Sequence, residues 1–347
     1  MNDVDSLIFS LISYMDLAGI VPEDPRETSI PLKTAANSFF ARHPDPKKIS
    51  MGVIVPKEII TLFREAKDTR RFRSVELCAH TNLIDPVQEM QFSATTFLLE
   101  DGSTVVAYRG TDDTLIGWKE NFNMSFLTTV PAQQHATEYL EHISLHFAGN
   151  LYVTGHSKGG NLAVYAAVHA ASDVRNRIRQ VWSNDGPGFS GGMLTAPAYL
   201  EMRARIKTLV PQSSVVGMLL EHDENYIVVK SRQAGPFQHD GMSWNVMGGS
   251  FVILDRISEG SRKLDRTLND WVRSMTPEQR EEFVDAMYRV LSVNNATTLT
   301  ELVSNGKQLI FKGKKQQQHL DPQVYQTIQK TLALLFDNKK NSLTVKK

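Results

Sequence analysis

The chain has 347 residues, of which 41% are hydrophobic and 22% charged, as is usual for a folded globular protein. Its 38 Lys and Arg residues balance 38 Asp and Glu residues, so there is no net basic charge with which to bind nucleic acid. The single cysteine, Cys78, excludes an internal disulfide, and the acidic N-terminus lacks a signal-peptide pattern; together they favour a cytoplasmic location. No run of 18 apolar residues is present, so we expect no membrane span.

The first 150 residues combine helix-like and strand-like periodicity. Apolar residues recur at helical spacing in three segments, and a proline-containing connector follows the first of them. Two β-prone segments flank Asp101-Gly102, a two-residue hairpin signal. The expected elements are therefore helices at 6–18, 57–67 and 132–147, and strands at 92–99 and 104–108.

From residue 151 onward, short apolar strands alternate with helices. The expected strands are 151–154, 180–183, 206–210 and 226–229, and a helix follows the first of them to about residue 171. This alternation predicts an α/β fold: an open, mostly parallel sheet flanked by helices on both faces. We expect this domain to cover residues 1–254.

The last part of the sequence is predicted to be helical. Thr276-Pro277 with Gln279 is typical of a helix start, because Thr caps the helix and Pro suits its first turn. Residues 255–347 are therefore expected to form a helical appendage with a basic, lysine-containing tail. Its further helices are expected at 254–272, 297–304 and 321–336, with a polar loop at 306–320.

The most informative motif is Gly155-His156-Ser157-Lys158-Gly159, which reads G-x-S-x-G. It lies between an expected strand and an expected helix, the context of a nucleophile elbow, in which a sharp turn exposes a serine hydroxyl. The helix start supplies backbone N–H groups and a positive dipole end. We therefore predict an α/β-hydrolase fold with Ser157 as the nucleophile.

A serine nucleophile needs a base, normally a histidine oriented by a carboxylate, and in this fold they follow in the order Ser, acid, His. His239 is the favoured base because it lies in a turn-rich loop after the last expected strand; His222 is the rival, and His169 and His319 are less well placed. Asp185 is the favoured acid because it ends a strand, where a carboxylate points into the crevice. Asp223 is its rival, and Asp240 is at most a helper.

An oxyanion hole needs two donors. The first is the backbone N–H of Lys158, directly after the nucleophile; the second usually comes from the loop after an earlier strand, here at Thr111. We also expect the Lys158 side chain to bring a positive charge near the crevice. The apolar segment 111–130 is expected to be either a lid over an acyl pocket or ordinary core.

These motifs resemble a known family. The segment Tyr108-Arg109-Gly110-Thr111, with Trp118 and Asn121, is similar to the oxyanion loop of class 3 lipases, and G-H-S-K-G-G-N-L-A at 155–163 resembles their elbow. The arrangement is most similar to an uncharacterised bacterial family of lipase-like hydrolases with this elbow and a Q-H-D segment. Over about residues 5–300, the resemblance implies a serine hydrolase acting on acyl esters.

The chain also departs from the class 3 pattern. Lys158 stands where these lipases usually have leucine, and the stretch 211–217 has no carboxylate where they carry their acid, which favours Asp185. The expected substrate is a small-molecule acyl ester or a lipid, with transient contact to a lipid surface but no cofactor, metal or nucleic acid. A thioesterase or amidase with the same site and a non-catalytic scaffold are the alternatives.

Overall fold

The structure is a computed structural model that describes the chain except for residues 53–54, 190–191, 224, 263–273, 293–295 and 305–347. The strands of the main sheet are β1 (Ile30–Pro31), β2 (Glu76–Asp85), β3 (Met90–Leu98), β4 (Thr104–Tyr108), β5 (Leu151–His156), β6 (Ile178–Asn184), β7 (Ile206–Pro211), β8 (Tyr226–Val229) and β11 (Ile253–Leu254). β9 (Val246–Met247) and β10 (Ser250–Phe251) form a separate small hairpin.

The main sheet runs in the order β1-β2-β3-β4-β5-β6-β7-β8-β11. Its centre, β4 to β8, is parallel, and the outer strands β1, β2, β3 and β11 pair antiparallel to their neighbours. The connections from β4 to β7 carry α-helices, as is usual for crossovers in a parallel sheet, and the connection from β7 to β8 carries a short 3₁₀ turn, Val216–Met218. With the sharp turn between β5 and the following helix, this is the predicted α/β-hydrolase fold.

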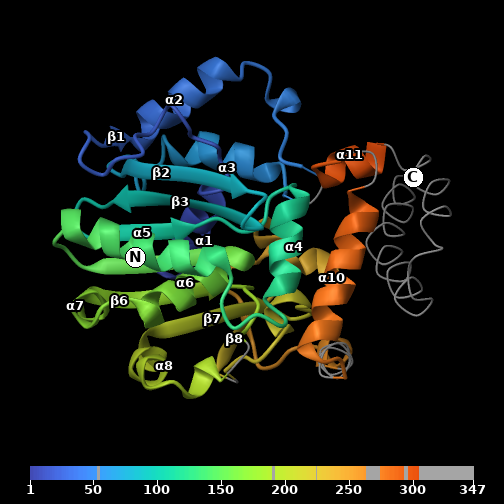
Figure 1. Ribbon diagram of the computed structural model, residues 1–347. Helices are drawn as coiled ribbons and strands as arrows, with labels where there is room; N and C mark the ends of the chain where they lie inside the picture. Colours follow the sequence, from blue (N-terminus) through green and yellow to red (C-terminus); the bar gives the residue numbers. More distant parts are fainter. Residues whose placement is uncertain (53–54, 190–191, 224, 263–273, 293–295, 305–347) are drawn as a thin grey trace.

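Helices cover both faces of the sheet (Figure 1). They are α1 (Asp3–Ile12), α2 (Leu32–Arg42), α3 (Glu58–Ala66), α4 (Leu115–Asn123), α5 (Pro131–His146), α6 (Lys158–His169), α7 (Ser172–Arg177), α8 (Pro197–Met202), α10 (Pro277–Leu291) and α11 (Leu299–Ser304). Short 3₁₀ turns, such as Gly235–His239, connect several of the elements. Helices α1 and α3 share one core cluster with the sheet, and α5 and α6 share another.

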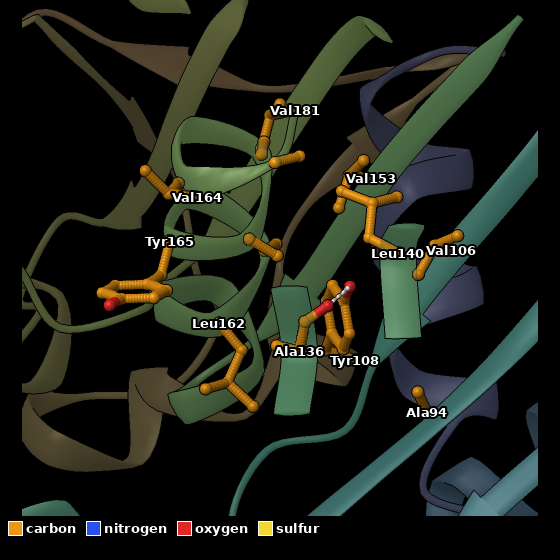
Figure 2. Packing of buried hydrophobic residues seen from close by; sticks show 14 of the residues in the cluster. Ala94, Val106, Tyr108, Ala136, Leu140, Val153, Leu162, Val164, Tyr165 and Val181 are labelled. Carbon is orange, nitrogen blue, oxygen red and sulfur yellow. Dashed lines mark hydrogen bonds between the residues drawn. The ribbon is translucent and has the colours of Figure 1, made fainter. Parts of the chain in front are cut away.

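Alternation along β4 separates these two cores. Val106 and Tyr108 face α5 and α6, whereas Val105 and Ala107 face α1 and α3, as a period of two requires. Figure 2 shows the first core, in which the Tyr108 hydroxyl donates to the Ala136 carbonyl oxygen across 2.6 Å. Both faces of the strand are fully buried, so β4 is fixed between two helical layers.

Most of the predicted elements are confirmed, including β4 over its full predicted length and the β3–β4 hairpin, in which Leu98 pairs with Thr104. Several elements were not predicted: the helices α2, α4, α7 and α8 and the strands β1, β2, β9 and β10. The strand period of β2 is broken by a register shift between Cys78 and Thr81, where Ala79 has a φ of 51°. Helix α2 was missed because it begins directly after Pro31, at the end of a proline-containing segment that was expected to be a connector.

The C-terminal part differs from the prediction in one place. Residues 253 and 254 form β11, antiparallel to β8, where a helix was expected to begin. The helix that starts after Thr276 is confirmed as α10, with the expected capping box, and α11 lies within the expected 297–304. The expected loop 306–320 and helix 321–336 lie outside the described residues, and the domain boundary at 254 stays a prediction.

Helix α10 lies beside α4, at the end of the sheet where the elbow lies (Figure 1). Phe283, Val284 and Met287 of α10 form an apolar cluster with Leu115 of α4. In the part of the chain that the structure describes, no helix is both long enough and apolar enough to cross a membrane.

Candidate active site

Ser157 occupies a strained turn between β5 and α6. Its φ of 58° and ψ of −132° lie in a region that non-glycine residues rarely adopt, and such conformations persist only where the surroundings enforce them. Gly155 and Gly159 make the turn possible, because a Cβ on either would collide with backbone of Gly159 or Tyr108, respectively. The sharp turn is the geometry of a nucleophile elbow.

The structure brings Asp185 and His239 together. Asp185 directly follows β6, and His239 ends the 3₁₀ turn after β8. The His239 Nδ1–H donates to Asp185 Oδ2 across 2.7 Å, with the carboxylate fully buried and the imidazole 22% exposed. This bond leaves His239 Nε2 as the ring nitrogen that can accept a proton.

The segment 211–217 supplies hydrogen-bond donors to Asp185. The Ser214 hydroxyl donates to Asp185 Oδ1 across 2.5 Å, and the Gly217 N–H donates to the same oxygen across 3.2 Å. A carboxylate that accepts several hydrogen bonds is held in one orientation. The sequence showed only that this segment lacks an acid; its role as a donor to Asp185 was missed, because nothing in the sequence pairs Ser214 with Asp185.

His156, the residue before Ser157, contacts His239. Its Nε2–H donates to the His239 carbonyl oxygen across 2.8 Å, so its Nδ1 is free to accept from the Tyr14 hydroxyl at 3.2 Å. The two imidazole rings are 4.7 Å apart. Burial lowers the pKa of His156 to about 3, with a smaller contribution from His239, so His156 stays neutral beside its neighbour.

Thr111 lies in the turn after β4, next to the elbow. The backbone of Gly110 passes so close that a Cβ there would be 2.6 Å from the His156 carbonyl oxygen and 3.0 Å from Ser157 Cβ. Asn121 Nδ2 donates to Thr111 Oγ1 across 2.6 Å. Lys158 is the first residue of α6, so its N–H has no partner within the helix. Backbone donors therefore lie on both sides of the Ser157 turn.

The other candidates for the acid and the base have different contacts. Asp223 pairs with Arg203, whose nearby guanidinium lowers the pKa of Asp223, and His222 Nδ1 contacts the Leu220 carbonyl oxygen. Asp240 caps the following turn by accepting from the Met242 N–H. His319 lies outside the described residues. Between Ser157 Oγ and His239, both of them described, the structure contains no hydrogen bond.

The Lys158 side chain is buried, which contradicts the expected positive charge near the crevice. Only 1% of it is exposed, and its ammonium donates to Glu120 Oε2 across 2.9 Å. No local pattern indicates this pair, because 37 residues separate its members along the chain. In the described ranges, no group of three or more His, Cys, Asp or Glu side chains is placed to hold a metal ion.

The segment 111–130 packs against the C-terminal helices. Trp118, Phe122 and Phe126 contact the apolar cluster that α10 forms with α4. The Leu115 N–H donates to the Thr297 carbonyl oxygen across 2.8 Å. Leu115 is buried, as in ordinary core, whereas Leu127 is 38% exposed, and the expectation of a lid stays a prediction.

Residues 66–289 match the Mbeg1-like family. The chain belongs to the Mbeg1-like family. Among curated proteins, none matches this Mbeg1-like chain.

Solved structures similar to this Mbeg1-like protein include fungal lipases. A Rhizomucor miehei lipase in complex with its propeptide has 11% identity and a TM-score of 0.37, with 65% of this chain and 70% of that chain covered. Lipase II from Rhizopus niveus has 12% identity and a TM-score of 0.33, covering 46% and 68%. A triacylglycerol lipase from Penicillium expansum has 13% identity and a TM-score of 0.32, covering 46% and 71%.

Proposed function

We propose that this protein is a serine hydrolase that cleaves carboxylic acyl esters of small molecules or lipids through an acyl-enzyme. The observation that carries the proposal is the 2.7 Å hydrogen bond from His239 Nδ1 to the buried Asp185, next to the strained turn at Ser157. A serine held at an elbow with a carboxylate-oriented histidine nearby is the arrangement that activates a hydroxyl for acyl transfer.

The proposed reaction uses residues of this chain alone. His239 Nε2 accepts the Ser157 proton as Oγ attacks the acyl carbon, and the N–H groups of Lys158 and Thr111 stabilise the oxyanion. The imidazolium of His239, stabilised by Asp185, then protonates the leaving alcohol. A water molecule, deprotonated by His239, hydrolyses the acyl-enzyme and regenerates Ser157. Since no hydrogen bond joins Ser157 and His239 in the structure, substrate binding must bring these groups into contact.

Labelling by a fluorophosphonate probe tests the proposal. The wild type should be labelled covalently, whereas Ser157→Ala should not, and its ester hydrolysis should fall by about 10⁴-fold or more, as for other triad nucleophiles. Ser250→Ala, at an exposed serine in β10, is the matched control and should be labelled like the wild type. Equal labelling of Ser157→Ala and the wild type would refute the proposal.

A substrate panel then identifies the bond that is cleaved. Oxyesters, thioesters and anilides with the same acyl group isolate the leaving group, and a graded series of nitrophenyl esters reports the acyl length that the site accepts. The proposal expects Ser157-dependent turnover to be fastest with the oxyesters. A clear preference for thioesters or anilides would make the protein a thioesterase or an amidase instead.

A further inference from the structure

Lys158 and Glu120 form an ion pair in the interior, directly behind the elbow. The Lys158 side chain is 1% exposed and that of Glu120 is 0% exposed. The Lys158 ammonium donates to Glu120 Oε2 at 2.9 Å and to the Gln91 carbonyl oxygen at 2.6 Å. Glu120 also accepts from the Gln91 N–H at 3.0 Å and the Ala132 N–H at 2.9 Å. The pair thus joins β3, α4, α5 and α6.

Stability alone is a poor explanation for such a pair. Removing two charges from water is costly, and apolar residues of similar volume often replace a buried pair without loss of stability. What a fully hydrogen-bonded pair provides is a fixed geometry between the elements that carry it. Here these elements include the helix that starts at Ser157 and the helix α4.

The next residue of α4 extends this connection to the other side of the elbow. Asn121 Nδ2 donates to Thr111 Oγ1 across 2.6 Å. Since Thr111 Oγ1 accepts this bond, its own hydroxyl proton is available to another acceptor. Lys158 therefore holds α4 at Glu120, and α4 holds Thr111 at Asn121. The two proposed oxyanion donors are linked through one helix.

We propose that the Lys158–Glu120 pair is a positioning device that sets the distance between the two oxyanion donors, the N–H groups of Lys158 and Thr111. The inference rests on the proposed function and adds to it a role for a lysine side chain that never touches the substrate. Donors that stabilise an oxyanion act only within a narrow range of positions, and a misplacement of about 1 Å costs on the order of 100-fold in rate.

The expected signature is a loss of kcat at nearly constant KM. The oxyanion exists only in the transition state, so an imperfect hole slows the chemical step without weakening ground-state binding. A purely structural role predicts a lower melting temperature but a normal kcat for the protein that remains folded. The two roles are thus separated by kinetics measured well below the melting temperature of each variant.

The test compares Lys158→Met with the double variant Lys158→Met/Glu120→Gln. The single variant leaves a buried carboxylate without its cation and is expected to lose stability. The double variant removes both charges and keeps a carbonyl oxygen for one of the two backbone N–H groups, those of Gln91 and Ala132, so it is expected to lose less stability than the single variant. Both should lose about 10- to 100-fold in kcat and in the rate of fluorophosphonate labelling, with KM changed less than about threefold.

Lys119→Met is the matched control. Lys119 precedes Glu120 on α4 and is also paired with acids, Glu89 and Asp285, but its contacts reach neither Ser157 nor Thr111. It should keep kcat within about threefold of the wild type. A folded double variant with wild-type kcat would overturn this inference alone, provided that the wild type shows Ser157-dependent labelling. If the wild type shows no such labelling, the proposed function fails and the inference fails with it.

Discussion

Asp185 accepts hydrogen bonds from His239, Ser214 and Gly217 while it is fully buried. Asp223, the other acid that the sequence offered, instead pairs with Arg203, whose side chain is half exposed. An acid that orients a catalytic histidine must hold one ring nitrogen in a single tautomer, which requires a fixed carboxylate. Only Asp185 has that contact, so the proposed reaction depends on it.

Replacing Asp185 with asparagine should therefore remove most of the activity. The amide can present its N–H₂ to His239 Nδ1 and favour the wrong tautomer, which on the triad precedent costs about 10⁴-fold in kcat. Asp223→Asn should keep kcat/KM for a nitrophenyl ester within about threefold of the wild type, because the contacts of Asp223 with Arg203 and the Asn225 N–H include none with Ser157 or His239. A larger loss in Asp223→Asn than in Asp185→Asn would assign the acid to residue 223.

The residues around the site were unequally predictable. Ser157, Asp185 and His239 were selected because local sequence places each after an expected strand, and the structure shows them after β5, β6 and β8. The contacts of Lys158 with Glu120 and of His156 with Tyr14 join residues far apart in the chain. Local periodicity carries no information on such long-range pairing, so these partners needed the structure.

At the scale of elements, α4 and α10 form one packing unit. Leu115 of α4 is buried against Phe283 and Met287 of α10, and Arg280 Nη1 donates to the Ser125 carbonyl oxygen across 2.7 Å. Lys119 adds an ion pair to Asp285 at 2.7 Å. Because Asn121 of α4 also binds Thr111, we expect a large loss of apolar packing between α4 and α10 to affect the proposed oxyanion hole.

Truncating Met287 to alanine should loosen this unit. The side chain is 3% exposed, and removal of a buried Met costs about 2–5 kcal/mol. Hydrogen exchange of the α4 amides at 115–123 should accelerate, whereas exchange in β5 should change little, because local opening follows packing units. Glu281→Ala, at an exposed position on the same helix, should change stability by less than about 0.5 kcal/mol. Unchanged α4 exchange in Met287→Ala would show that α4 is held independently of α10.

For the whole molecule, the central parallel sheet was predictable because each of its strands is a short apolar run bounded by helix or turn signals. The strands at the edges of the sheet were harder to predict from the sequence. β2 is interrupted by the positive φ of Ala79, and β11 has two residues, too few for a period to be recognised. The strand order was not predicted; in the structure β4 to β8 lie in chain order, in agreement with the rule that connected parallel strands lie next to each other.

Helix α1 precedes the part of the chain that matches the family, yet it is tied into the centre of the sheet. The Ser10 hydroxyl lies 2.8 Å from Thr154 Oγ1 of β5, and the Trp182 indole N–H of β6 donates to Asp3 at 2.7 Å. Tyr14, just beyond the C-terminal end of α1, contacts His156. The N-terminal segment thus belongs to the same cooperative core as the proposed active site.

This attachment makes global stability dependent on pH through His156. The pKa of His156 is lowered to about 3 by burial, whereas an unfolded histidine has a pKa near 6.5. Above pH 6.5 the His156 imidazole is neutral in both the folded and the unfolded state, so this group does not change the stability. As the pH falls below 6.5, the His156 imidazole becomes protonated in the unfolded state but stays neutral in the folded state. The free energy of unfolding therefore decreases until about pH 3. The loss for this one group is about 2 kcal/mol between pH 7 and pH 5.

His156→Gln isolates this contribution. Glutamine keeps a donor for the His239 carbonyl oxygen and an acceptor for Tyr14 but does not titrate. Urea unfolding at pH 7 and pH 5 should show that the wild type loses about 2 kcal/mol more than the variant. The groups that face the ring, Tyr14, His239 and Asp185, are present in both proteins, so their titration largely cancels in the difference. Equal losses in the two proteins would mean that His156 also takes up a proton in the folded state. The neutral His156 described beside His239 would then be wrong.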